Sequence, residues 1–209
     1  MTQRLYYTSD ATETTAQLLR CTPTQDGQYA VVLDRTLFHP QGGGQPADWG
    51  EIAGIAVTGV STQGEAVIHQ VARPIATGEV TLRIDKARRA SCARLHSAGH
   101  LIGCAGERYG WLPVKAHHWP GEGRITFSPG DAASVPDPAA LEETLACWQS
   151  QQLARYVEFR DGLRLVGFAG LPAYPCGGTH VANLGDIPPV VISGVKIKKG
   201  QLIIQYQVE

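Results

Sequence analysis

The pattern of apolar and polar positions along the chain changes near residue 85. Before that point, short alternating runs are separated by Gly, Pro, Asp and Gln turns, without the spacing of a long helix. Alternation with a period of two is typical of strands that bury one face. The predicted strands are residues 29–33, 51–59, 65–71 and 79–84. This half of the chain therefore predicts a small β-barrel.

The second half mixes helix and strand patterns. Residues 86–109 lack proline and are rich in Ala, Leu and Arg, which predicts a helix. A second helix is expected to begin with Asp137 as N-cap and Pro138 at the first helical position, and to run to about Leu153. Strands are expected at 124–127, 155–159, 163–168, 190–198 and 201–208, the last two joined by a hairpin turn at Lys199-Gly200. The predicted fold class is α+β, with domains 1–86 and 87–209.

Composition leaves this interpretation unchanged. The 209 residues are 43% hydrophobic and 18% charged, as in ordinary globular proteins. No basic start followed by an apolar stretch opens the chain, and no window is long enough to cross a bilayer. Five scattered cysteines do not form a disulfide framework, so no disulfide-linked partner is expected. We expect a cytoplasmic protein without a membrane partner.

Two short segments of the second half carry candidate metal ligands. His96 and His100 are four residues apart in the predicted helix, so both imidazoles lie on one face. Cys176 and His180 flank two glycines and a threonine, and the glycines permit a tight turn. Each pair alone is a weak signal. Together they offer the nitrogen and sulfur ligands that suit zinc. The chemical softness of these ligand atoms alone does not exclude iron or cobalt. We expect one Zn²⁺ per chain.

Four protein ligands raise a question about the role of such a metal. Zinc with four protein ligands is normally structural, whereas hydrolytic zinc keeps a position for water. Either one of the four residues is not a direct ligand, or the metal expands its coordination or mainly orients a substrate. Position 97 is serine, so the His-Glu-x-x-His signature of zinc peptidases is missing.

A glycine-rich segment lies in the first half of the chain. Residues 38–50 read FHPQGGGQPADWG, and three successive glycines before Gln-Pro are not expected inside a strand. The segment matches neither the phosphate-binding loop nor the dinucleotide fingerprint. It predicts a shaped loop.

Positive charge is unevenly distributed although the net charge is only −1. One short stretch is strongly basic, and a smaller cluster lies near the C-terminus. Such clusters fit either phosphate contacts or a solvated surface. The candidate residues for phosphate contacts are Arg83, Lys86, Arg88, Arg89, Lys196, Lys198 and Lys199.

The order of these motifs carries a family resemblance. The glycine-rich segment is followed by HSAGH at 96–100 and by CGGTHV at 176–181. This order resembles the stand-alone alanyl-tRNA editing proteins, the AlaX group, and the homologous editing domain of alanyl-tRNA synthetase. The glycine-rich β half is similar to the medium-length form of the group. Threonyl-tRNA synthetase carries a related domain with a different residue pair between Cys and His.

The resemblance implies a fold, a site and an activity. The fold would be a small β-barrel followed by an α+β zinc-containing editing domain of the threonyl/alanyl-tRNA synthetase type, with His96, His100, Cys176 and His180 as zinc ligands. The activity would be trans-editing, an ATP-independent hydrolysis that deacylates mischarged tRNA(Ala), chiefly Ser-tRNA(Ala) and secondarily Gly-tRNA(Ala). The partner would be tRNA(Ala) that carries the wrong amino acid. Since no aminoacylation domain is present in the sequence, correction without synthesis is expected.

Further site residues are candidates within this interpretation. Ester hydrolysis needs an activated water and a stabilised oxyanion, and the sequence leaves open whether the metal acts on the carbonyl, the water or the α-amino group. The catalytic candidates are His117, His118 and Gln45, and the substrate-binding candidates are Gly42, Gly43, Gly44, Gln45 and Thr179.

Two positions depart from the family pattern. Gly99 stands where the family often has threonine, and His39 stands where a tyrosine is common. Gly99 removes any pocket contact of a threonine hydroxyl and weakens the helix locally.

Two other functions use the same residues. A non-catalytic tRNA-binding module with a structural zinc would need the same ligands and basic residues, and a small-molecule metallohydrolase would need only the metal.

Overall fold

The computed structural model describes residues 1–209, and the contacts divide the chain into two compact units. The first unit contains residues 1–42 and 46–90, and the second contains residues 43–45 and 91–209. Strands dominate and two α-helices are present, which agrees with the predicted α+β class. No helix combines the length and the apolar content that a membrane crossing requires.

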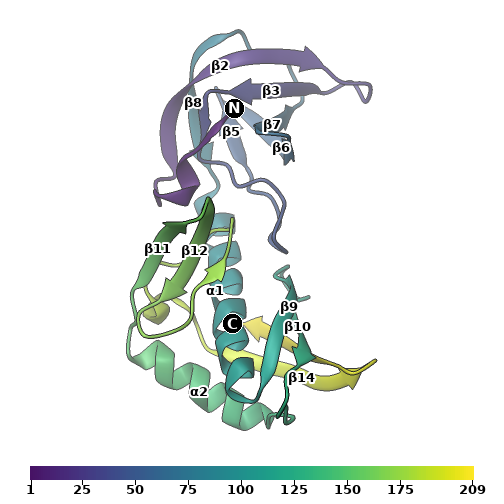
Figure 1. The fold of residues 1–209 in the computed structure, drawn as a ribbon. Helices are drawn as coiled ribbons and strands as arrows, with labels where there is room; N and C mark the ends of the chain where they lie inside the picture. Colours follow the sequence, from purple (N-terminus) through teal and green to yellow (C-terminus); the bar gives the residue numbers. More distant parts are fainter. The chain divides into compact units, whose positions relative to one another are not determined.

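Six strands of the first unit close into a barrel (Figure 1). Their order around the barrel is β2 (Glu13–Pro23), β3 (Tyr29–Leu33), β7 (Ala66–Val71), β6 (Ile55–Gln63), β5 (Gly50–Ile52) and β8 (Gly78–Ile84). The same unit contains the parallel pair β1 (Gln3–Arg4) and β4 (Arg35–Thr36), and a 3₁₀ turn at Leu5–Tyr7. Alternate strand residues such as Val31, Leu33, Val67 and Leu82 are fully buried, because period-two alternation directs one side of each strand inward.

Two details of the barrel differ from the sequence prediction. The predicted strand 51–59 is instead a hairpin of β5 and β6, because Ala53 and Gly54 adopt φ of 50° and 72° at its turn. β2 was not predicted, since only Ala16 and Leu18 of its residues are buried and its exposed face includes Leu19. The other predicted strands of this half are confirmed within a residue.

His69 is a polar residue in the barrel core. Its side chain is fully buried, with Nε2 at 2.8 Å from Thr36 Oγ1 and Nδ1 at 3.2 Å from Val31 O. Burial disfavours the charged imidazole and lowers the pKa of His69 from 6.5 to about 4, although the bond to Val31 acts in the opposite direction. His69 is therefore neutral at pH 7 in the folded protein.

Acid should destabilise the protein less when His69 is replaced by glutamine. Below pH 6.5 the unfolded chain takes up a proton at His69 that the folded chain excludes, so stability falls between about pH 6.5 and about pH 4. This loss is on the order of 3 kcal/mol. Thermal unfolding of wild type and His69→Gln across this range measures it. The other buried histidines contribute equally to both proteins, so the difference between the two stability profiles reports on His69. If the stability of both proteins falls equally with pH, His69 is not the group that the folded chain keeps unprotonated.

The second unit builds two sheets around the part of α1 (Lys86–Arg108) that begins at residue 91. In Figure 1, β11 (Arg155–Arg160) and β12 (Leu163–Phe168) lie on one side of α1, and β9 (Trp111–His117) and β10 (Arg124–Pro129) lie on the other. The larger sheet has the order β14 (Val190–Lys198), β15 (Gln201–Val208), β10, β9, and β13 (Tyr174–Pro175) completes the smaller one. Their shared core includes Leu101, Phe127, Leu145 and Ile204, all of them fully buried.

Local signals place most elements of this unit. α2 (Pro138–Ser150) begins as predicted, because Asp137 Oδ1 accepts hydrogen bonds from the N–H groups of Ala139 (2.9 Å) and Ala140 (3.2 Å). The terminal hairpin turns at Lys199 and Gly200, both with positive φ. A 3₁₀ turn at Leu184–Asp186 precedes β14. β9 was not predicted because it contains Pro113, which its place at the edge of the sheet tolerates.

Candidate functional site

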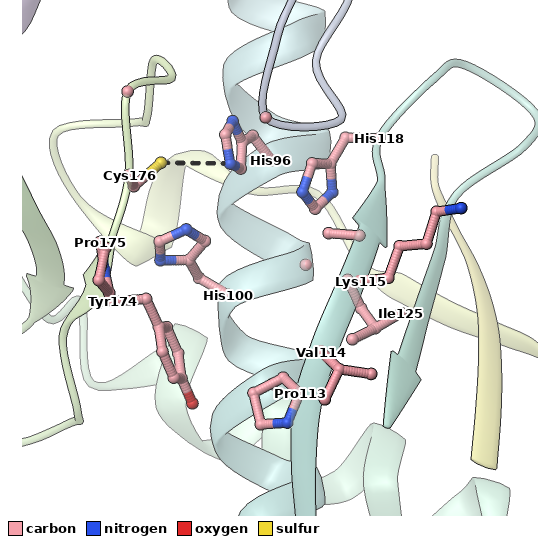
Figure 2. Close-up of a pocket in the computed structure, with 15 residues that line it drawn as sticks. His96, His100, Pro113, Val114, Lys115, His118, Ile125, Tyr174, Pro175 and Cys176 are labelled. Carbon is pink, nitrogen blue, oxygen red and sulfur yellow. Dashed lines mark hydrogen bonds between the residues drawn. The ribbon is translucent and has the colours of Figure 1, made fainter. Parts of the chain in front are cut away.

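Four side chains of the second unit converge on one point. α1 carries His96 and His100 on one face, and the segment after β13 supplies Cys176 and His180. The ligand atoms of all four lie within 4.8 Å of one another. Cys176 Sγ is 3.4 Å from His96 Nε2 (Figure 2). The same sulfur is 3.2 Å from His180 Nε2. The structure thus brings the two sequence pairs together as a cluster that could hold a metal ion.

The chemistry of the donor atoms fits zinc. Three imidazole nitrogens and one thiol sulfur form a ligand set that Zn²⁺ accepts. A histidine that binds through Nε2 carries its proton on Nδ1 and donates it to a neighbour. His96 Nδ1 has such an acceptor in Gln45 Oε1 at 2.7 Å, and His180 Nδ1 has one in Ser97 Oγ at 3.1 Å. Both rings therefore direct their lone pairs at the cluster.

Gln45 is a positioning residue in this arrangement. Its Oε1 also accepts the N–H of Thr179 at 3.0 Å, and its Nε2 donates to Thr179 Oγ1 at 2.8 Å. Gln45 is fully buried and its amide joins the segment of His180 to the ring of His96. Gln45 and Thr179 are absent from the pocket wall, so their contacts support the ligands.

Arg164 holds the loop that carries the thiol. This buried arginine of β12 donates from Nη1 to the carbonyls of Cys176 (2.8 Å) and Gly178 (3.0 Å). Desolvation, reinforced by Arg164, lowers the pKa of His100 to about 4 and that of His180 below its usual range. Burial raises the pKa of the Cys176 thiol, while the Gly178 N–H and Arg164 act to lower it. The imidazoles of His100 and His180 are thus neutral at pH 7, which is the form that binds metals.

A pocket of about 370 Å³ opens beside the cluster. His96, His100 and Cys176 form part of its wall, Gly99 and Gly103 of α1 line it, and residues of β9 and β10 close the other side (Figure 2). The lining residues of β9 and β10 are Pro113, Val114, Lys115, Ala116 and Ile125. The volume suits a small ligand.

The two adjacent histidines have different surroundings. His118 is 1% exposed, lines the pocket, and stacks on His96 with ring centroids 4.2 Å apart. Burial lowers the pKa of His118 to about 3, with smaller effects from His100 and His117. His117 is absent from the pocket wall, pairs with Glu122 at 3.0 Å and stacks on Trp119.

The glycine-rich loop contributes differently along its length. Gly43 lines the pocket, and Gly44 O accepts the backbone N–H of His118 at 2.8 Å. Gly44 has φ of 80°, and a Cβ there would meet the carbonyl of Ala116, so a side chain is excluded. Gly42 belongs to the first unit and is not part of this wall.

The structure shows which side chains surround Gly99. A Cβ at Gly99 would lie well under 3.0 Å from Cε1 of His118, and 2.9 Å from the hydroxyl of Tyr206. The space that a threonine side chain would take at this position is filled by the imidazole of His118.

The basic candidates divide by exposure. Arg89 is 8% exposed, and its guanidinium is bound by Asp48 and by the carbonyl of Leu37, so the structure gives it a structural contact and not a phosphate site. Arg88 stacks over Trp49 and donates to Ala47 O. The remaining candidates are exposed: Arg83, which pairs with Glu13, and Lys86, Lys196, Lys198 and Lys199.

Comparison with known proteins agrees with the motifs. Residues 163–202 match the model of the threonyl and alanyl tRNA synthetase second additional domain. An alanine–tRNA ligase of Korarchaeum cryptofilum is 30% identical, over 84% of this chain and 23% of that protein. The alanyl-tRNA editing protein Aarsd1 of Rattus norvegicus is 28% identical, over 90% of this chain and 54% of that protein. The chain is related to the alanyl-tRNA editing proteins.

This relationship confirms the resemblance seen in the motifs. The domain match includes β12, the loop with Cys176 and His180, and all of β14. The longer alignments extend over both units, since 98% of this chain aligns with an alanine–tRNA ligase of Nitrosopumilus maritimus at 24% identity. The chain spans about a quarter of the length of the ligases and about half of the editing protein.

Proposed function

We propose that the protein is a zinc-dependent aminoacyl-tRNA hydrolase that deacylates mischarged tRNA(Ala), chiefly Ser-tRNA(Ala) and secondarily Gly-tRNA(Ala). The observation that carries the proposal is that three of the four donors, His96, His100 and Cys176, line a pocket. A structural zinc site is closed, whereas a catalytic site keeps an open position. The relationship to alanyl-tRNA editing proteins supports an aminoacyl-tRNA as the substrate.

The pocket suits the end of such a substrate. About 370 Å³ accommodates a small aminoacyl group and part of a ribose, but it is too small for a folded macromolecule to enter. Lys115 brings a positive charge to the wall, where a phosphate or another electron-rich group of the terminal nucleotide would meet it. Pro113, Val114 and Ile125 provide apolar surface against which the substrate would pack.

The reaction breaks the ester bond between the amino-acid carbonyl carbon and the ribose oxygen. The oxygen of water adds to that carbon, the ribose oxygen leaves with a proton, and a free amino acid and tRNA result. When bound, Zn²⁺ supplies Lewis acidity toward oxygen or nitrogen groups of the substrate or water. Gln45 and Ser97 keep the rings of His96 and His180 oriented, and Arg164 fixes the loop of Cys176.

Exposed basic residues are proposed to contact the rest of the tRNA. Arg83 and Lys86 lie in the first unit, and Lys196, Lys198 and Lys199 lie in the terminal hairpin of the second. Lysine and arginine contacts to phosphates strengthen binding without sequence preference and make it dependent on salt.

A deacylation time course tests the proposal. With Ser-, Gly- and Ala-tRNA(Ala), we expect serine to be released fastest and alanine slowest, and a chelator to stop release until Zn²⁺ is restored. Mischarged tRNA that binds without release would support the non-catalytic module. Equal cleavage of a free seryl ester and of Ser-tRNA(Ala) would support the small-molecule hydrolase.

A further inference from the structure

A chain of hydrogen bonds fixes the protonation of His118. The hydroxyl of Tyr206 lies 2.9 Å from the carbonyl of Leu95 and 2.6 Å from Nδ1 of His118. A carbonyl only accepts, so Tyr206 donates its one hydrogen to Leu95. Both contacts are hydrogen bonds only if Nδ1 of His118 carries a proton and donates it to Tyr206. Nε2 then keeps a lone pair and can accept a hydrogen bond.

The imidazole is also fixed in place. Its ring stacks on His96 at an angle of 25°, and the backbone N–H of His118 donates to Gly44 O at 2.8 Å. Tyr206, which anchors the ring, is itself 1% exposed. Such a ring loses little conformational entropy when it forms one more hydrogen bond.

Gly99 of α1 has no side chain and leaves space for the His118 ring. Gly99 and His118 both line the pocket, and any side chain at position 99 would overlap the imidazole. Figure 2 shows His118 beside His96 on the side of the pocket opposite Cys176 and Tyr174. His118 therefore lines the pocket beside the candidate metal ligands, and Nε2 is the ring nitrogen left to accept a hydrogen bond. Besides the candidate ligands, Lys115 and Tyr174 are the other polar side chains of a wall that is otherwise apolar and glycine surface.

From this geometry we propose that Nε2 of His118 accepts a hydrogen bond from the side-chain hydroxyl of a seryl substrate and sets the preference for serine over alanine. The inference rests on the proposed function. Serine supplies an O–H donor, whereas alanine and glycine leave the desolvated nitrogen without a partner. An unsatisfied buried acceptor penalises binding of the analogue that lacks the donor. His118 is thereby a specificity-determining residue.

The test compares His118→Phe with the matched control His117→Phe. Phenylalanine keeps a planar ring but offers no acceptor, and His117 is the same residue type one position away, outside the pocket wall. Single-turnover release of serine and alanine from tRNA(Ala) gives the selectivity ratio. We expect His118→Phe to lower the serine-to-alanine ratio about tenfold to a hundredfold, mainly through slower serine release, and His117→Phe to leave it unchanged.

Tyr206→Phe provides a second route to the same question. This variant leaves His118 in place but removes the hydroxyl that holds the proton on Nδ1, so we expect a smaller loss of selectivity with the same direction. Zinc content and melting temperature of each variant show whether the site is intact. If His118→Phe loses zinc or fails to fold, Tyr206→Phe decides the question.

The outcomes separate the two proposals. Wild type that releases no serine contradicts the proposed function. Active, zinc-containing His118→Phe with an unchanged ratio, or with serine and alanine release slowed equally, overturns the role of His118 alone. An unchanged serine-to-alanine ratio in zinc-containing Tyr206→Phe would likewise overturn the role of His118.

Discussion

Cys176→Ser should lower zinc affinity by about a hundredfold or more and reduce deacylation to near background. Residues that only support metal ligands typically contribute a factor of about 10–100 in affinity, and a direct ligand contributes at least as much. Cys176 Sγ approaches both His96 and His180, so no neighbouring group replaces it. Zinc content after dialysis against a chelator of known affinity, together with serine release, measures both effects.

Cys147→Ser is the matched control for this substitution. Cys147 is an exposed cysteine on α2 that belongs to neither the cluster nor the pocket wall, so its replacement changes the same atom outside the site. We expect unchanged zinc and unchanged activity. Full zinc retention in Cys176→Ser would remove this thiol from the ligand set, and the proposal would then need another fourth group.

Gly178→Ala should displace a ligand without removing any donor atom. A Cβ at residue 178 would overlap the ring of His96 and would lie 2.8 Å from Oε1 of Gln45. Both neighbours are buried and joined to each other, so neither can move freely. Overpacking of this kind costs about 1–3 kcal/mol. We expect loss of bound zinc and a fall in serine release of at least about a hundredfold, measured as for Cys176.

Gly194→Ala serves as the comparison for Gly178→Ala. In β14 a Cβ at residue 194 would meet the end of the flexible Gln205 side chain at 3.1 Å, which can move aside. Zinc and activity should remain at the wild-type level. Normal zinc binding by Gly178→Ala would mean that His96 can shift and is not held as the structure shows.

Residue spacing predicted the parts of the site that depend on neighbouring positions. The helical repeat predicted that His96 and His100 share one face, and Asp137 and Pro138 predicted the start of α2. Both predictions depend only on residues within about one helical turn of each other. Cys176 and His180 were paired by the glycines between them. The sequence motifs were therefore sufficient to name the four residues of the cluster.

The supporting contacts could not be predicted in this way because they join distant positions. Gln45 and Thr179 are 134 residues apart, and Tyr206 and Leu95 are 111 residues apart. No local pattern marks Ser97 within the helix, because its partner His180 is distant in sequence. No local pattern marks Arg164 within its strand either, because its role depends on hydrogen bonds to the loop of Cys176. Lys115 was missed because it lies in the unpredicted strand β9.

The membership of residues 43–45 in the second unit affects how the protein can be divided. A fragment that begins at residue 91 would retain His96, His100, Cys176 and His180, but it would lose Gln45 and leave the Nδ1 proton of His96 without its acceptor. It would also lose the carbonyl of Gly44 that holds the backbone of His118. The complete site is therefore not encoded in one continuous stretch, and an isolated C-terminal fragment would be a poor substitute for the intact chain in metal-binding studies.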